Sequence, residues 1–133
     1  MLRLEIVTPE KRVLDAEVDS VTVPTASGEI GVLPHHAPLV SALKPGILAY
    51  YVKGVASKLA VSGGFVEINT DKVAVLVDTA EAAEEINVDA ARLERESAEK
   101  ALAAAGQASS DDTEQTREAI DHATARLQLA AGK

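Results

Sequence analysis

Cysteine, tryptophan and long apolar runs are absent from this chain of 133 residues, and aromatic side chains make up only 2% of it. The lack of cysteine excludes disulfide bonds and thiolate chemistry, and it suits a reducing compartment. Because Tyr50, Tyr51 and Phe65 are the aromatic residues, the core must consist of Val, Leu, Ile and Ala, and a base-stacking platform is not expected. No apolar run is long enough to span a bilayer or to form the centre of a signal peptide, so we expect membrane contact only through a partner.

Positive charge is also scarce. The chain has 13 Lys and Arg against 21 Asp and Glu, a formal charge of −8. Nucleic-acid binding and adhesion to an anionic membrane both need a basic surface, so neither is expected. The imbalance is concentrated after residue 80, where six cationic residues face twelve acidic ones, against seven and nine before it.

Residues 1–80 have the pattern of β structure. Leu2, Leu4 and Ile6 alternate with polar residues, which is typical of a half-buried strand. Turn signals at 53–54 and 69–71 lie between apolar runs, which predicts two hairpins. Many short strands joined by tight turns predict a β-sandwich or a small barrel.

The last third of the chain is rich in Ala, Glu and Arg and predicts two helices, at 88–105 and 112–131. Asn87 is expected to cap the first helix, and Gly106 to end it. Asp111 and Glu114 resemble a capping box for the second helix. The short linker between them predicts an antiparallel helical hairpin.

The expected seam of this hairpin holds mostly small side chains. Its positions are Val88, Ala91, Arg95, Ala98, Leu102 and Ala105 on the first helix, and Thr116, Ile120, Ala123, Leu127 and Ala130 on the second. Burying one Leu or Ile contributes about 1.5–3 kcal/mol, so this seam predicts a marginal hairpin that docks weakly. The two helices end to end would reach roughly 55–60 Å.

Glycine and proline are concentrated between residues 28 and 46, in GEIGVLPHHAPL and ALKPG. This stretch carries no nucleophile, so it predicts a shaped contact surface. His35 and His36, with Glu29, leave open a metal-dependent β-barrel enzyme, but the sequence lacks the spaced His-x-His pair and the downstream ligands that such a site needs. Gly63–Gly64 predicts a β-bulge or a close backbone approach. The acidic residues at 81, 84 and 85 predict a solvated linker.

Four motifs in order resemble the ε subunits of bacterial and plastid F-type ATP synthases. They are LEIVTPEKRV (4–13), VTVPTASGEIGVLPHHAPLVSALKPG (21–46), SGGFVEI (62–68) and KVAVLVDTAE (72–81). The resemblance covers essentially the whole chain. It implies a β-sandwich of about ten strands in residues 1–84 and a two-helix regulatory domain in residues 85–133.

The same resemblance implies a non-catalytic rotor subunit on the cytoplasmic face of the bacterial plasma membrane. It would bind the γ subunit and the c-ring, couple proton flow to ATP synthesis, and inhibit ATP hydrolysis by contacting the α and β subunits through its helices. No cofactor is required and no metal site is implied. The residues that match the family's contact segment are Glu29, Pro34, His35, His36, Ala37, Pro38 and Leu39. His35 departs from the family, which often has Gly there.

Some family members bind ATP through Ile/Leu-Asp-x-x-Arg-Ala and further arginines on the second helix. Here Val88, Asp89 and Arg92 match the motif in part, Arg126 matches one later arginine, and His122 replaces another. Losing a guanidinium removes a phosphate partner, so only weak regulatory ATP binding is expected. A free nucleotide-sensing module is the remaining alternative.

Overall fold

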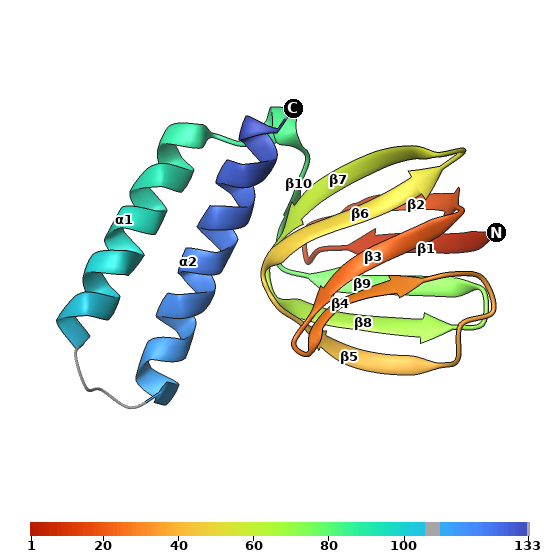
Figure 1. Ribbon diagram of the computed structural model, residues 1–133, viewed down its shortest axis with the longest axis horizontal. Helices are drawn as coiled ribbons and strands as arrows, with labels where there is room; N and C mark the ends of the chain where they lie inside the picture. Colours follow the sequence, from red (N-terminus) through yellow and green to blue (C-terminus); the bar gives the residue numbers. More distant parts are fainter. Residues whose placement is uncertain (106–109, 133) are drawn as a thin grey trace.

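The computed structural model describes residues 1–105 and 110–132 and consists of a β-sandwich followed by a helical hairpin (Figure 1). The strands are β1 (Leu2–Val7), β2 (Arg12–Val18), β3 (Ser20–Thr25), β4 (Gly28–Val32), β5 (Leu39–Leu43), β6 (Gly46–Val52), β7 (Val55–Val61), β8 (Gly64–Asn69), β9 (Lys72–Val77) and β10 (Ala80–Glu81). A short 3-10 turn, η1 (Ala83–Glu85), leads to α1 (Val88–Ala105) and α2 (Ser110–Ala131). The predicted fold class is confirmed.

The strands form one continuous sheet that folds over on itself. Its order is β10-β7-β6-β3-β5-β8-β9-β1-β2, with β4 paired to β3. Strand β3 joins the two layers, because it pairs with β6 at its start and with β5 at Thr25. Only β1 and β9 pair in parallel among the strands described. Figure 1 shows the layer with β6 and β7 facing the helices.

The core between the layers is aliphatic. Leu2, Leu4 and Ile6 are fully buried, as their alternation predicts. The other buried members of the core are Val18, Val21, Val23, Val32, Leu43, Leu48, Leu59, Val61, Val66, Ile68, Val73, Val75 and Val77.

Tight turns hold the hairpins in register. Lys53 and Gly54 have φ values of +51° and +78°, the positive pair that a type I′ turn needs between β6 and β7. Gly64 begins β8, and a Cβ there would overlap the carbonyl oxygen of Leu76 on β9. The predicted close backbone approach at this glycine is therefore confirmed.

Both predicted helices are present. The Asn87 side chain caps α1 by accepting a hydrogen bond from the Ala90 N–H at 3.0 Å. Helix α2 begins at Ser110, two residues before the predicted start. The predicted roles of Gly106 and Asp111 lie outside the residues and side chains that the structure describes.

Helix α2 lies between α1 and the sandwich (Figure 1). Ala91 and Ala123 are fully buried in the helix pair, as the seam predicts, but Val88 is 38% exposed at the start of α1. The prediction also missed a second apolar face of α2. Ala125 and Leu129 pack against Ala60 of β7 and Ile86. Helix α2 needs this second apolar face because it packs against α1 on one side and against the sandwich on the other.

Candidate functional site

The Gly/Pro-rich block forms β4, the connection to β5, and β5 itself. In the connection His35 has φ +67°, a conformation that costs other residues energy but not glycine. Its N–H donates to the Thr70 carbonyl at 2.7 Å, and its Nδ1 lies 3.5 Å from Asp71 Oδ1. The connection is therefore held against the β8–β9 turn, with His35, Ala37, Pro38 and Leu39 exposed and Pro34 and His36 half-buried.

Glu29 lies apart from this connection. It is exposed on β4 opposite Pro24 and lines a cavity with Asp121 and Thr124 of α2. Figure 1 shows the β3–β4 turn on the side near α2 and the β4–β5 connection on the far side. The three residues of the metal-enzyme alternative do not come together, because Glu29 is remote from both histidines. His36 Nδ1 instead lies 2.7 Å from the carbonyl oxygen of the neighbouring Ala37. In the described part of the chain, no three His, Asp or Glu side chains form a metal-binding group.

Apolar side chains are exposed on the outside of β5, β8 and β9, where Glu67 lies opposite Val40. Val40, Phe65 and Leu76 are 68%, 59% and 50% exposed, and Phe65 pairs directly with Leu76. Val7 pairs with Leu76 from β1, and a cavity of about 450 Å³ adjoins the pair. Exposed apolar patches on a sheet mark interaction surfaces.

Sequence reasoning missed this surface, although β9 carries a usable signal. Its residues Val75, Leu76 and Val77 are apolar in succession, a pattern that strands show when both faces are covered. Among the described residues, only the inner face of β9 is covered, and Leu76 is exposed on the outer face.

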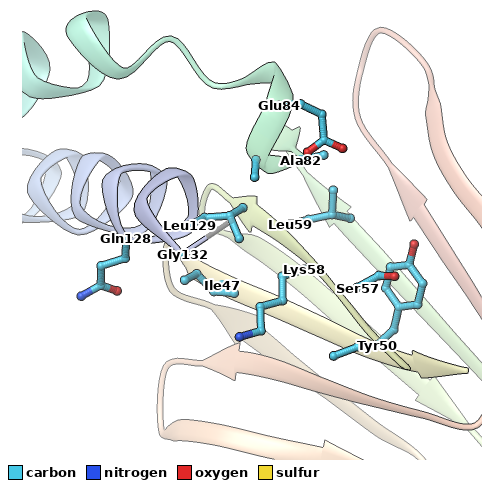
Figure 2. Close-up of a pocket in the computed structure, with 12 residues that line it drawn as sticks. Ile47, Tyr50, Ser57, Lys58, Leu59, Ala82, Glu84, Gln128, Leu129 and Gly132 are labelled. Carbon is cyan, nitrogen blue, oxygen red and sulfur yellow. The ribbon is translucent and has the colours of Figure 1, made fainter. Parts of the chain in front are cut away.

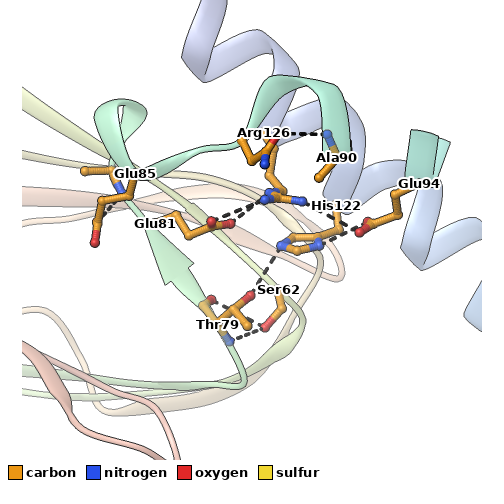
Figure 3. Close-up of polar contacts among 10 residues, drawn as sticks. Ser62, Thr79, Glu81, Glu85, Ala90, Glu94, His122 and Arg126 are labelled. Carbon is orange, nitrogen blue, oxygen red and sulfur yellow. Dashed lines mark hydrogen bonds and ion pairs between the residues drawn. The ribbon is translucent and has the colours of Figure 1, made fainter. Parts of the chain in front are cut away.

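Polar side chains join the hairpin to the sandwich (Figure 3). Arg126 of α2 places Nε 2.8 Å from Glu81 of β10 and a terminal nitrogen 3.7 Å from Glu94 of α1. His122 lies 3.5 Å from the same Glu94 and 3.3 Å from the Thr79 hydroxyl. The prediction that Glu81 is part of a solvated linker is wrong, because β10 pairs with β7 and turns this carboxylate toward α2.

A cavity lies beside the apolar part of the contact between α2 and the sandwich. Leu129 packs beside Ala60 and Ile86, yet a cavity of about 520 Å³ adjoins it (Figure 2). Ile47, Tyr50 and residues 56–59 of β7, which include Ser57 and Lys58, line the cavity from the sandwich side. The apolar contact between the helices and the strands therefore centres on Leu129 and its few neighbours, with a cavity open beside it.

The residues predicted for ATP occupy two places. Asp89 and Arg92 pair with each other on α1 at 3.5 Å, with side chains 88% and 58% exposed, and Val88 is exposed beside them. Arg126 is 12% exposed and engaged by Glu81 and Glu94. An entering phosphate would have to displace these carboxylates.

Comparison with known proteins gives consistent results. Residues 1–83 match the family model described as ATP synthase, Delta/Epsilon chain, beta-sandwich domain. An ATP synthase epsilon chain of Desulforamulus reducens is 45% identical over 128 residues, covering 96% of each chain. One of Herpetosiphon aurantiacus is 43% identical over 129 residues, covering 97% of this chain and 93% of the relative.

The fold also matches solved structures. A chain in the cryo-EM structure of the Euglena gracilis mitochondrial ATP synthase, OSCP/F1/c-ring in rotational state 1, superposes with a TM-score of 0.78 at 27% identity. The match covers 98% of this chain and 81% of that one. A chain in the Tetrahymena thermophila mitochondrial ATP synthase central stalk and c-ring structure shares the fold with a TM-score of 0.61 at 19% identity. The chain therefore belongs to the ATP synthase ε chain family, as a non-catalytic subunit of the F-type enzyme.

Proposed function

We propose that this chain turns with the central stalk, couples proton flow through the c-ring to ATP synthesis, and restrains ATP hydrolysis through its helical hairpin. The observation that carries the proposal is that the two layers of the sandwich present different surfaces. One sheet face is apolar and uncovered at Phe65 and Leu76, whereas the opposite layer holds a hairpin through a small contact. A stalk subunit that also inhibits ATP hydrolysis needs one surface that stays attached to the stalk and one element that can move.

The apolar face suits the γ subunit. Val40, Phe65 and Leu76 form a surface of the kind that permanent partners cover, since such interfaces resemble part of a protein core. The connection from Pro34 to Leu39 adjoins this face through β5 and offers a second contact to γ or the c-ring. Glu29, at the other end of β4, would meet the c-ring separately.

The hairpin suits the regulatory role toward α and β. Its docking combines one buried leucine, Leu129, with ion pairs at Arg126, so its free and docked states are expected to differ by only a few kcal/mol. ATP is a weak regulatory ligand in this proposal, because Arg126 already has two carboxylate partners. Calorimetry with ATP would then give a dissociation constant in the millimolar range.

The place of action in the proposal is the cytoplasmic face of the bacterial plasma membrane, within the assembled enzyme. Among the helices that the structure describes, none is long and apolar enough to cross a membrane.

Two measurements test the proposal. Phe65→Glu is expected to abolish co-purification with γ, whereas Val55→Glu, an equally drastic change at a residue 66% exposed on β7, is expected to preserve it. Equal binding of γ by both variants would contradict the assigned face. Deleting residues 88–133 is expected to raise ATP hydrolysis by the assembled enzyme, and unchanged hydrolysis would remove the regulatory role while leaving the stalk role intact.

A further inference from the structure

Among the described residues, α2 makes most of the contacts between the helices and the sandwich. Helix α2 contacts β6, β7 and η1, whereas α1 packs on the far side of α2 (Figure 1). Within the described residues, the side-chain hydrogen bonds and ion pairs that connect the hairpin to the strands come from Arg126 and His122. These two side chains lie one helical turn apart on α2 and share Glu94 of α1 as a partner.

We propose that Arg126 is an ionic latch whose guanidinium, held between Glu81 of β10 and Glu94 of α1, keeps the hairpin docked on the sandwich. The regulatory meaning of the latch rests on the proposed function, but the docking itself is a property of this chain alone. Arg126 is a positioning residue in this role. It acts by fixing where two other parts of the chain lie.

The geometry of Arg126 gives it more weight than a surface ion pair. Its side chain is 12% exposed, its Nη2 donates a hydrogen bond to Glu81 Oε2 at 3.3 Å, and its Nε lies 2.8 Å from Glu81 Oε1 as an ion pair without a hydrogen bond. The contact therefore combines charge attraction with one directed hydrogen bond. Partly buried pairs are screened by salt less than exposed ones, and breaking one leaves the partner charge poorly solvated.

The charge of the surrounding parts makes the latch necessary. Both the helical region and the strand region carry net negative charge. On α1, Arg92 and Arg95 form ion pairs within the helix, with Asp89 at 3.5 Å and with Glu99 at 3.8 Å. Without the Arg126 guanidinium, Glu81 and Glu94 would face each other across the junction as two carboxylates, and an attractive contact would become a repulsive one.

His122 supports this arrangement from the neighbouring turn. Its Nδ1 lies 3.5 Å from Glu94 and its Nε2 lies 3.3 Å from the Thr79 hydroxyl. Thr79 is itself fixed, because its N–H donates to the Ser62 hydroxyl at 2.9 Å. His122 thus holds Glu94 beside Arg126. The latch therefore joins β10, α1 and α2.

The test measures the docked fraction in the full chain without nucleotide. Because the chain has no cysteine, the pair Val55→Cys on β7 and Ser97→Cys on α1 can carry spin labels at two exposed sites outside the junction. A docked hairpin gives one narrow distance, and a released hairpin gives a broad distribution. We expect Arg126→Gln to lower the ratio of docked to released molecules about tenfold or more. The matched control Arg92→Gln, which removes the same charge from an exposed pair on α1, is expected to change it less than about twofold.

Two further variants separate a latch from a general loss of structure. Glu81→Gln breaks the same contact from the strand side and is expected to release the hairpin without touching either helix. The exchange Arg126→Glu with Glu81→Arg is expected to recover part of the docking lost in Arg126→Glu. Helix content is followed by circular dichroism, and if Arg126→Gln unfolds α2, the Glu81→Gln result decides.

Equal docked fractions in the wild-type chain, Glu81→Gln and Arg126→Gln would overturn the latch. Failure of the latch and failure of the proposed function are distinct outcomes. The hairpin can be latched in the isolated chain and still leave ATP hydrolysis by the assembled enzyme unaffected, and it can inhibit hydrolysis while docking through its apolar contacts alone.

Discussion

His35 lies in the left-handed region at φ +67° with its Nδ1 3.5 Å from Asp71, so a strained residue of the β4–β5 connection is held by the turn between β8 and β9. Glycine adopts this conformation without steric cost, whereas other residues lose roughly 1–2 kcal/mol.

Replacing His35 separates backbone strain from side-chain contact. We expect His35→Val to destabilise the chain by about 1–2 kcal/mol, because a β-branched side chain tolerates positive φ poorly. His35→Gly is expected to be neutral or to stabilise it by up to about 1 kcal/mol. Urea unfolding of both variants and of Asp71→Asn measures this. A His35→Val variant as stable as His35→Gly would show that the backbone is not strained here.

Gly64 offers a sharper test of close packing. A Cβ at Gly64 would overlap the Leu76 carbonyl, so Gly64→Ala must move β8 away from β9. We expect a loss of about 3 kcal/mol or failure to fold. The control is Gly31→Ala, where a Cβ meets nothing within 4 Å, and its loss should be below about 1 kcal/mol. Similar unfolding free energies for the two variants would contradict the described approach of the strands.

Leu129 should account for most of the apolar docking of α2. It is 7% exposed, and truncation to alanine is expected to weaken docking by about 2 kcal/mol, at the low end for buried leucine because a cavity already adjoins it. Leu93→Ala on α1, where the side chain is 65% exposed, should leave docking unchanged. Hydrogen exchange of the α2 amides reports both effects. Unchanged protection in Leu129→Ala would place the docking energy elsewhere.

The turn between β6 and β7 can be improved. Lys53 has φ +51° in a type I′ turn, a position that asparagine fills at lower cost. We expect Lys53→Asn to stabilise the chain by about 0.5 kcal/mol. The same change at Lys58, in the middle of β7, should not stabilise it, because asparagine is unfavourable in strands. Thermal unfolding of the two variants distinguishes a turn effect from the loss of one positive charge.

Several strands and both helices could be predicted from local patterns in the sequence, whereas β10 was expected to be part of a linker. Period-2 alternation marked β1, the turn residues marked the β6–β7 hairpin, and Asn87 marked the start of α1. The Gly63–Gly64 signal also had a local cause, since only a residue without Cβ fits beside Leu76.

The junction could not be predicted in this way because it depends on distant segments. Glu81 and Arg126 are 45 residues apart, and neither has a local pattern that points to the other. Glu81 resembled one more acid in a linker, and Leu129 lies off the stripe that faces α1. The position of α2 between two neighbours gives it two buried faces, and a single periodicity describes only one of them.

The connection through η1 also has a mechanical consequence. Helix α2 has 22 residues, so the hairpin is a lever arm roughly 33 Å long. Its covalent pivot is the few residues between Glu81 and Val88. A turn of only 10° about that pivot would carry the far tip of the hairpin through roughly 6 Å, about one helical pitch. A small rotation beside β10 therefore moves the far end of the hairpin far enough to change which residues it contacts.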